Sequence, residues 1–199
     1  TDRSVLIHCP AGLAVMARTG VTNWQFETTA QPGLNGRRGY QPRGKTLGGS
    51  SSINAMVYIR GQREDYDRWA AMGNPGWSYD EVLPYFKRAE HNETHGASQY
   101  HGAGGPLNVA ELRTPSSLSK AFVKAAVLNG ISETADYNGA DQFGSFLYQV
   151  TQKNGERWSV ARGYLDPARG RPNLKIETGA FATRVLFDGH RAVGDEVLG

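Results

Sequence analysis

The stretch of this chain best suited to binding chemistry runs from residue 44 to residue 61. Its first half contains the run Gly48-Gly49-Ser50-Ser51-Ser52, and its second half is apolar and favours a strand. Adjacent glycines let the backbone adopt positive φ and let another molecule approach the main chain closely. Hydroxyls and free N–H groups at such a place suit an anionic or strongly polar ligand. The stretch therefore predicts a binding site for a ligand of that kind.

Basic side chains gather in the same part of the chain. Residues 1–60 hold seven lysines and arginines against two acidic residues, although the net charge of all 199 residues is only +3. An anionic ligand fits this excess, but the basic residues lack the density of a nucleic-acid-binding surface. Hydrophobic residues make up 39% of the sequence and charged residues 21%, which is typical of a folded globular protein. No nucleic-acid partner is expected.

A phosphate-binding motif overlaps the glycine-rich stretch. Residues 39–46 fit the P-loop pattern G-x-x-x-x-G-K-[ST]. A P-loop requires a buried strand before it and a helix after it, with the N-terminus of that helix facing the phosphates. Here residues 32–38 are turn-forming and basic, and residues 48–52 are poor helix formers. A nucleotide-binding module at Gly39–Thr46 is therefore a minor alternative.

Cysteine chemistry is limited to one residue. Cys9 is the only cysteine, so neither an intrachain disulfide nor a CxxC redox or metal motif can form. We predict no metal site in this chain. The sequence contains no signal peptide and no apolar run that approaches the length of a membrane span. A reducing, bacterial cytoplasmic location is expected, with membrane association as the alternative.

The elements that position these residues mix helices and strands without regular β-α-β alternation, which predicts an α+β fold or a piece of a larger α/β protein. Ser78 and Glu81 have the spacing of a capping box, which marks the start of one helix. Residues 1–43 are expected to be irregular, with a short strand near Phe26. The sequence pattern predicts helices at 63–72, 78–86, 118–128 and 161–165, and strands at 106–109, 146–151, 174–178 and 184–187.

A longer pattern gives a more specific interpretation. From about Ser4 to Val193 the chain resembles the glucose-methanol-choline (GMC) family of flavin oxidoreductases. Bacterial alcohol and choline dehydrogenases are the members with the most similar sequence motifs. The resemblance is carried, in family order and spacing, by residues 42–54, 57–61, 65–69, 76–86, 104–107, 136–139, 154–159 and 171–174.

The resemblance implies a site for noncovalent FAD. Some family members attach the flavin through a His just before the Asn of the first signature, and Ile53 occupies that position here. The implied contacts to the diphosphate and ribityl chain come from Gly48, Gly49 and Ser50. Those to the flavin ring come from Asn54, Ala55, Met56 and Val57, and a backbone contact to the adenine comes from Ala182.

The resemblance also implies an architecture: a fragment of a GMC-type FAD-binding domain together with part of its substrate (cap) domain. Residues 1–62 would form the flavin-contacting segment, residues 63–152 the cap region, and residues 153–199 a return to the FAD-binding domain. The family's G-x-G-x-x-G turn and its catalytic His find no match, so we expect no catalytic residue in this chain. The five histidines are instead expected to be surface residues.

The implied reaction is hydride transfer from a CH–OH carbon to FAD, with oxygen or a quinone as the electron acceptor. The expected partners are a small, choline-like alcohol and the remaining polypeptide of a split or cleaved enzyme. The isolated chain is expected to be inactive. A truncated, noncatalytic binding or scaffold protein is the main alternative.

Overall fold

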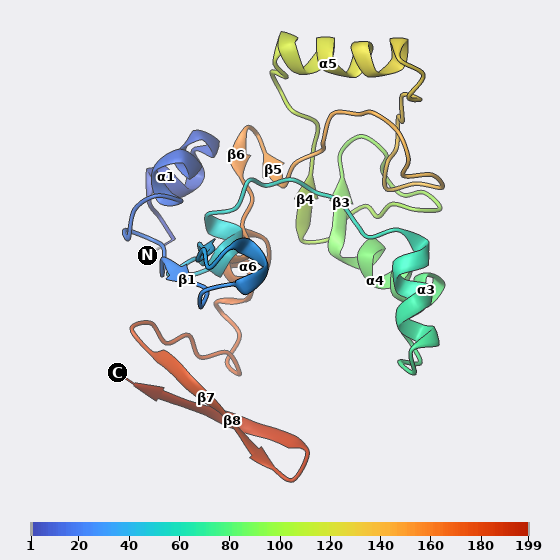
Figure 1. Ribbon diagram of the computed structural model, residues 1–199. Helices are drawn as coiled ribbons and strands as arrows, with labels where there is room; N and C mark the ends of the chain where they lie inside the picture. Colours follow the sequence, from blue (N-terminus) through green and yellow to red (C-terminus); the bar gives the residue numbers. More distant parts are fainter. Residues whose placement is uncertain (1, 199) are drawn as a thin grey trace. The chain divides into compact units, whose positions relative to one another are not determined.

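The computed structural model describes residues 2–198, which fall into two compact units (Figure 1). One unit ends at Pro167 and the other begins at Ala168. The helices are α1 (Val5–His8), α2 (Leu13–Met16), α3 (Arg63–Ala71), α4 (Tyr79–Ala89), α5 (Ser117–Leu128) and α6 (Asp166–Ala168), with short turns η1 (Pro10–Gly12), η2 (Pro32–Leu34), η3 (Gly49–Ser52) and η4 (Ala161–Leu165). The strands are β1 (Phe26–Glu27), β2 (Tyr40–Gln41), β3 (Glu90–Asn92), β4 (Leu107–Val109), β5 (Gln152–Lys153), β6 (Glu156–Arg157), β7 (Phe181–Asp188) and β8 (Arg191–Leu198).

The described strands form four two-stranded sheets. Three of the pairs (β1–β2, β5–β6 and β7–β8) are antiparallel, and β3 pairs with β4 in parallel. Mixed helices and small sheets without repeated β-α-β units confirm the α+β prediction. The division into domains at 62/63 and 152/153 stays a prediction.

The predicted long helices are present, and local signals explain where they begin. The Ser78 side chain accepts from the backbone of Glu81 while the Glu81 carboxylate accepts from the backbone of Ser78, which completes the capping box of α4. Ser116 caps α5 by accepting from the N–H of Leu118 at 3.2 Å. The predicted short helix at 161–165 is the π-helical turn η4.

The irregular structure predicted for residues 1–43 is wrong in part, because two short helices lie there. Ser4 caps α1 by accepting from the N–H of Leu6. Ile7 in α1 and Met16 in α2 then bury their side chains against Ile53 and form a small core. Long-range packing therefore stabilises helices that are too short to form alone.

Two predicted strands are also missing from their expected places. Residues 146–151 make only isolated bridges, through Val150 to Val57 and to Ala110. Residues 174–178 are irregular. Local β propensity was misleading here, since a strand also needs a partner with matching register.

The unit from Ala168 onward consists mainly of one hairpin. Strands β7 and β8 pair from Phe181↔Leu198 to Asp188↔Arg191, and Gly189 at the turn has a φ of 58°. Strand β7 extends beyond the predicted strand at 184–187 at both ends.

Among the described residues, no helix is both long enough and apolar enough to cross a bilayer.

Candidate functional site

The glycine turn, residues 44–52, is built so tightly that side chains are excluded from two of its positions. A Cβ added to Gly44 would lie 2.0 Å from the carbonyl oxygen of Gly49, and one added to Gly48 would lie 2.5 Å from Ser52 Oγ. Gly48 and Gly49 both have positive φ, at 84° and 55°. A Cβ on Gly49 would meet nothing within 4 Å, so the outer side of this residue is open to an approaching molecule.

The serine hydroxyls of the turn mostly stabilise the turn itself. Ser51 Oγ donates to the carbonyl of Gly48 at 2.6 Å and accepts from the N–H of Val160 at 2.9 Å. Ser52 is fully buried and donates to the carbonyl of Leu47 at 2.8 Å. Only Ser50 is exposed, and its Oγ accepts from the N–H of Gly44 at 3.2 Å.

The wall segment, residues 54–58, continues directly from the turn. The side chains of Asn54, Ala55 and Val57 are exposed, whereas Met56 is buried. Met56 has a φ of 62°, a conformation that is strained for a residue with a long side chain. Its sulfur accepts from Gln152 Nε2 at 3.6 Å, so Met56 offers a ligand its backbone rather than its side chain.

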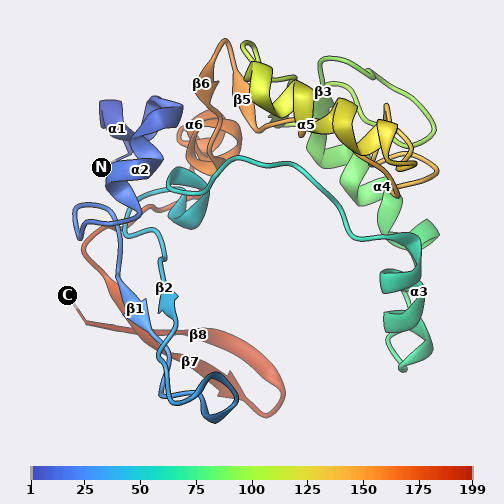
Figure 2. The same ribbon diagram turned by 45° about the horizontal axis from the view of Figure 1, so that its top comes forward.

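Segments almost a hundred residues away hold the wall segment in place. Val57 bridges to Val150, the N–H of Tyr58 donates to the carbonyl of Gln149 at 3.0 Å, and the Tyr137 hydroxyl donates to the carbonyl of Tyr58 at 2.7 Å. Burial raises the pKa of Tyr137 to about 12, which keeps that hydroxyl a neutral donor. Figure 2 shows the extended chain that runs from η3 through this segment to α3.

Arg157 in β6 connects the glycine turn to the wall segment through hydrogen bonds. Its Nε donates to the carbonyl of Ile7 at 2.9 Å, and its Nη1 donates to the carbonyl of Ser51 at 3.2 Å. The same Nη1 donates to the carbonyl and to Oδ1 of Asn54, both at 2.8 Å. Sequence reasoning missed this residue, although it lies within the 154–159 motif that supports the family resemblance.

The P-loop alternative does not fit the geometry of residues 39–46. Strand β2 passes through the motif, so the chain there is extended rather than curled around a phosphate. The following element is the 3-10 turn η3, not an α-helix with its N-terminus facing the motif. Lys45 Nζ lies 4.5 Å from the centroid of the Trp24 ring and is engaged in a cation–π contact.

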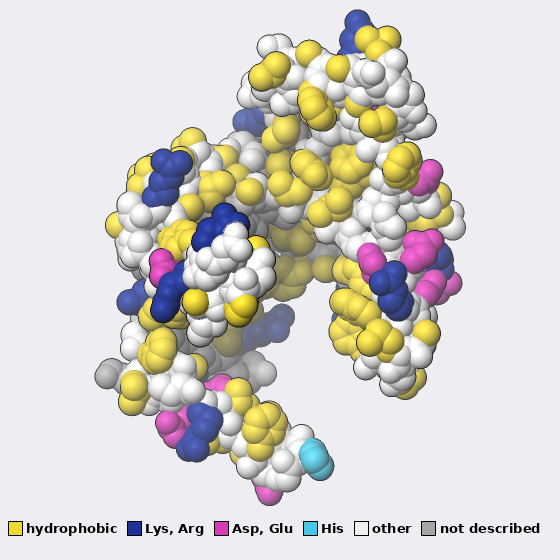
Figure 3. Space-filling view, in the orientation of Figure 1, with side chains coloured by type: hydrophobic (Ala, Val, Ile, Leu, Met, Phe, Trp, Pro, Cys, Tyr) yellow, Lys and Arg dark blue, Asp and Glu magenta, His cyan; other side chains and the backbone are white. Residues whose placement is uncertain are grey.

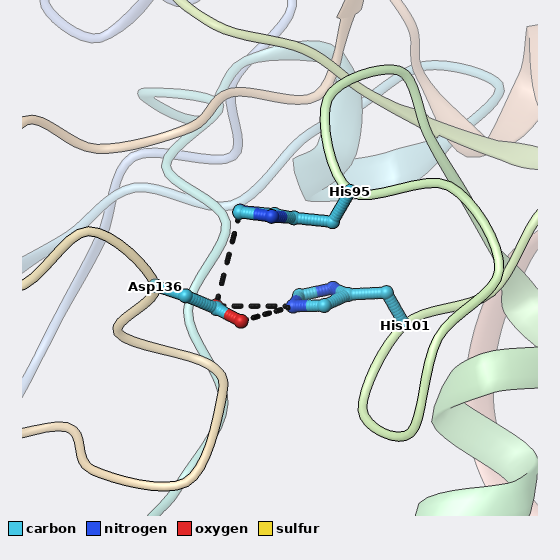
Figure 4. Close-up of side chains that lie close together, drawn as sticks. All are labelled: His95, His101 and Asp136. Carbon is cyan, nitrogen blue, oxygen red and sulfur yellow. Dashed lines mark hydrogen bonds and ion pairs between the residues drawn. The ribbon is translucent and has the colours of Figure 1, made fainter.

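Further along, the chain builds a buried charge cluster from Arg60, Glu90 and His101, with the partly exposed Asp136 at its edge. Arg60 Nη2 lies 2.8 Å from Glu90 Oε2, with both side chains almost inaccessible to solvent. His101 Nδ1 lies 3.1 Å from Glu90 Oε1, and His101 Nε2 lies 3.0 Å from Asp136 Oδ2 (Figure 4). The expectation that His101 is a surface residue is therefore wrong, because two carboxylates solvate it inside the protein.

Burial is the largest single influence on the pKa of His101 and on that of Glu90, but the hydrogen bonds and charges together outweigh it. Burial alone would lower the pKa of His101, but its bonds to Glu90 and Asp136 leave that pKa raised. Burial alone would raise the pKa of Glu90, but bonds from His101, the backbone N–H of Gly102 and Asn92 leave it lowered. The two shifts favour a protonated His101 imidazole beside an ionised Glu90 carboxylate.

His95 joins this cluster from the same loop, which raises the question of a metal centre at His95, His101 and Asp136. The two imidazole rings are stacked, with centroids 4.5 Å apart and planes 22° apart, and both point toward Asp136 (Figure 4). A metal ion binds in the plane of each imidazole that holds it, whereas stacked rings direct their in-plane lone pairs side by side rather than toward one nearby point. The geometry favours an ion-pair cluster, and the expectation of no metal site stays a prediction.

We expect the free energy of unfolding to fall as the pH rises through neutrality. The folded-state pKa of His101 lies above its ordinary value of about 6.5, so its stabilising contribution is complete below about pH 6.5 and is lost as the pH rises through the folded-state pKa. Denaturant titrations from about pH 5.5 to about pH 9 measure this slope, and His101→Gln should flatten it. His190→Gln, at an exposed position, is the control; equal slopes in wild type and His101→Gln would contradict the assignment.

Seven of the eight residues predicted to contact the ligand lie in two neighbouring stretches of the chain. Gly48, Gly49 and Ser50 belong to the glycine turn, and residues 54–57 belong to the wall segment. Ala182 lies in β7 of the other unit, and its contact stays a prediction.

Known sequences resemble the chain over nearly its whole length. Residues 8–198 match the GMC oxidoreductase family. The chain is 50% identical over 193 residues to "Alcohol dehydrogenase [acceptor]" of Pseudomonas putida, which covers 97% of this chain and 35% of that protein. It is 48% identical over 192 residues to "Choline dehydrogenase, mitochondrial" of Homo sapiens, which covers 96% of this chain and 32% of that protein. The chain thus spans about a third of the length of these relatives.

Solved structures give the same picture of the fold. Pyridoxine 4-oxidase from Mesorbium loti superimposes with a TM-score of 0.87 at 33% identity, covering 98% of this chain and 39% of that one. A fungal aryl-alcohol oxidase superimposes with a TM-score of 0.75 at 21% identity, which supports the fold alone. It covers 84% of this chain and 31% of that one.

Proposed function

The chain belongs to the GMC oxidoreductases, a family of flavoproteins, and from this premise we propose that it forms one side of the FAD site of an alcohol dehydrogenase or oxidase. The observation that carries the proposal is the glycine turn. Its outer side is open at Gly49, and the exposed residues of the wall segment follow closely in the chain, after the buried Ser52 and Ile53.

The residues present fit a dinucleotide. The positive φ of Gly48 and Gly49 brings main chain rather than side chain to the surface, as close contact with a diphosphate requires. Asn54, Ala55 and Val57 present short side chains along the wall segment, and Met56 adds its backbone. Ala182 would meet the adenine through its backbone. The buried, unpaired charge of Arg157 behind the same surface favours a negatively charged ligand.

Bound FAD would supply the chemistry by accepting hydride from the alcohol carbon. The residues of this chain would bind and orient the cofactor and exclude water from one side of it. The group that takes the hydroxyl proton would come from further polypeptide. The resemblance to alcohol and choline dehydrogenases supports a small, choline-like alcohol as substrate, with oxygen or a quinone as the acceptor.

We expect the flavin to be held without a covalent bond. Ile53, at the position of the attachment histidine in some family members, is 4% exposed and packs against Ile7 and Met16. Its side chain therefore points into the core. Acid precipitation of the purified complete polypeptide should release all FAD into the supernatant. Yellow colour that stays with the pellet would contradict this expectation.

Further polypeptide of the same enzyme is proposed as the partner of this chain. In α5 the side chains of Leu118, Phe122 and Leu128 are 78%, 74% and 77% exposed. Figure 3 shows hydrophobic side chains gathered over this helix and the chain beneath it. An apolar face of this kind marks an interaction surface, and the relatives are about three times as long as the chain.

Two measurements test the proposed function. The complete polypeptide should show flavin absorbance and reduce a dye in the presence of an alcohol, whereas colourless, inactive protein would refute the proposal. The alternative, a noncatalytic scaffold, predicts that the isolated chain of 199 residues is folded and monodisperse without FAD. Aggregation of the isolated chain would argue against that alternative.

A further inference from the structure

Arg157 is a buried charge that the packing of the chain does not explain. The residue is fully buried, yet its four hydrogen bonds go to uncharged oxygens of Ile7, Ser51 and Asn54. Its Nη2 is buried with no hydrogen-bond partner among the described residues. A buried cation without a counter-charge destabilises the folded state. The hydrogen bonds that Arg157 makes are therefore expected to serve a purpose beyond packing.

The most informative of these groups is the side chain of Asn54. Its Oδ1 accepts from Arg157 Nη1 at 2.8 Å and from the N–H of Met56 at 3.0 Å. Both partners can only donate, so they fix the oxygen of the amide inward and its nitrogen outward. Asn54 is exposed, and its Nδ2 has no hydrogen bond to another described residue. The wall segment therefore presents a donor, not an acceptor, at this point.

We propose that Arg157 is the positioning residue of the FAD site: it locks the Asn54 amide with its nitrogen facing outward, to donate to an acceptor atom of the flavin. The same guanidinium holds the carbonyls of Ser51 and Asn54 and so fixes the junction between the glycine turn and the wall segment. This inference rests on the proposed function, which supplies the identity of the ligand.

The test uses the apo form of the complete polypeptide, titrated with FAD and followed by flavin fluorescence. Arg157→Lys keeps the charge but loses the planar fork, and it should weaken FAD binding about tenfold, the factor expected for one charge-assisted hydrogen bond. Arg63→Lys is the matched control, because Arg63 forms an exposed pair with Asp80. If Arg157 acts through Asn54, the Arg157→Lys effect should vanish in an Asn54→Ala background. Equal effects in the two backgrounds would overturn the proposal and leave Arg157 a purely structural role.

A flavin-free measurement separates this inference from the proposed function. Hydrogen exchange at the Met56 N–H, which donates to Asn54 Oδ1, should be faster in Arg157→Lys than in wild type, even without FAD. Unchanged protection would overturn the inference. Failure of the wild type to bind FAD would instead refute the proposed function alone.

If Arg157→Lys does not fold, Asn54→Asp takes its place. A carboxylate still accepts from Arg157 and Met56 but offers no donor outward. It should retain the protection of the Met56 N–H and lose FAD affinity at least tenfold. Wild-type affinity in Asn54→Asp would overturn the proposal.

Discussion

Replacing Gly44 by alanine is expected to lower the FAD affinity of the complete polypeptide more than a hundredfold and to destabilise it by about 3 kcal/mol, the upper end for forcing a group into packed structure. The new Cβ would lie 2.0 Å from the carbonyl oxygen of Gly49 and 2.7 Å from the backbone nitrogen of Ser50. Gly44 has no room to retreat, because it bridges to Asn23 and the N–H of Lys45 donates to the carbonyl of Thr22 at 2.7 Å.

The displaced residues are therefore those of the glycine turn, which we propose contacts the cofactor. A displacement that costs about 3 kcal/mol of binding energy lowers FAD affinity more than a hundredfold. Gly33→Ala is the matched control, since a Cβ there meets nothing within 4 Å. Flavin content and thermal unfolding measure both effects. A Gly44→Ala protein with wild-type flavin content would show that the turn is not part of the site.

Replacing Glu90 by glutamine is expected to cost about 3–5 kcal/mol of folding stability, the range for breaking a buried ion pair from one side. Glu90 is fully buried and faces two cations, Arg60 and His101. Its Oε2 also accepts from the N–H of Gly102 at 2.8 Å. Removing the carboxylate leaves the Arg60 charge uncompensated at a position that water cannot reach.

The control for this variant is Asp80→Asn. Asp80 forms a bidentate pair with Arg63, but the two side chains are 74% and 46% exposed. An exposed pair contributes little to stability, because water screens its attraction. Denaturant unfolding of both variants compares the same chemical change in two environments. Equal losses would mean that the buried charge cluster is not the stabilising centre that its geometry indicates.

The parts of the fold that the sequence predicts are those with local causes. The capping box of Ser78 and Glu81 determines where α4 begins, and Ser116 does the same for α5. The dipeptide Asn154-Gly155 is typical of a hairpin turn with positive φ at both residues, and here the two φ values are 54° and 81°. The unusual backbone of the glycine turn could be predicted for the same reason, since positive φ at Gly48 and Gly49 follows from residue type.

The parts that were missed depend on distant partners. His101 looks like any loop histidine until Asp136, 35 positions later, is brought against it. Arg157 gives no periodic signal, because its contacts lie more than a hundred positions earlier in the chain. The inward side chain of Met56 depends on a positive φ that its residue type does not favour. Single-sequence reasoning has no access to such pairings.

The bonds from Arg157 to Asn54 have a further consequence for how the protein is made. The two residues are 103 positions apart, so the ribosome synthesises the wall segment well before it adds Arg157. At a synthesis rate of about 5–20 residues per second, this delay is about 5–20 s. Contacts at such separation also slow folding itself, because a long loop must close before they form. We therefore expect the proposed FAD site to assemble late in folding, and nascent chains that end before Arg157 to lack it.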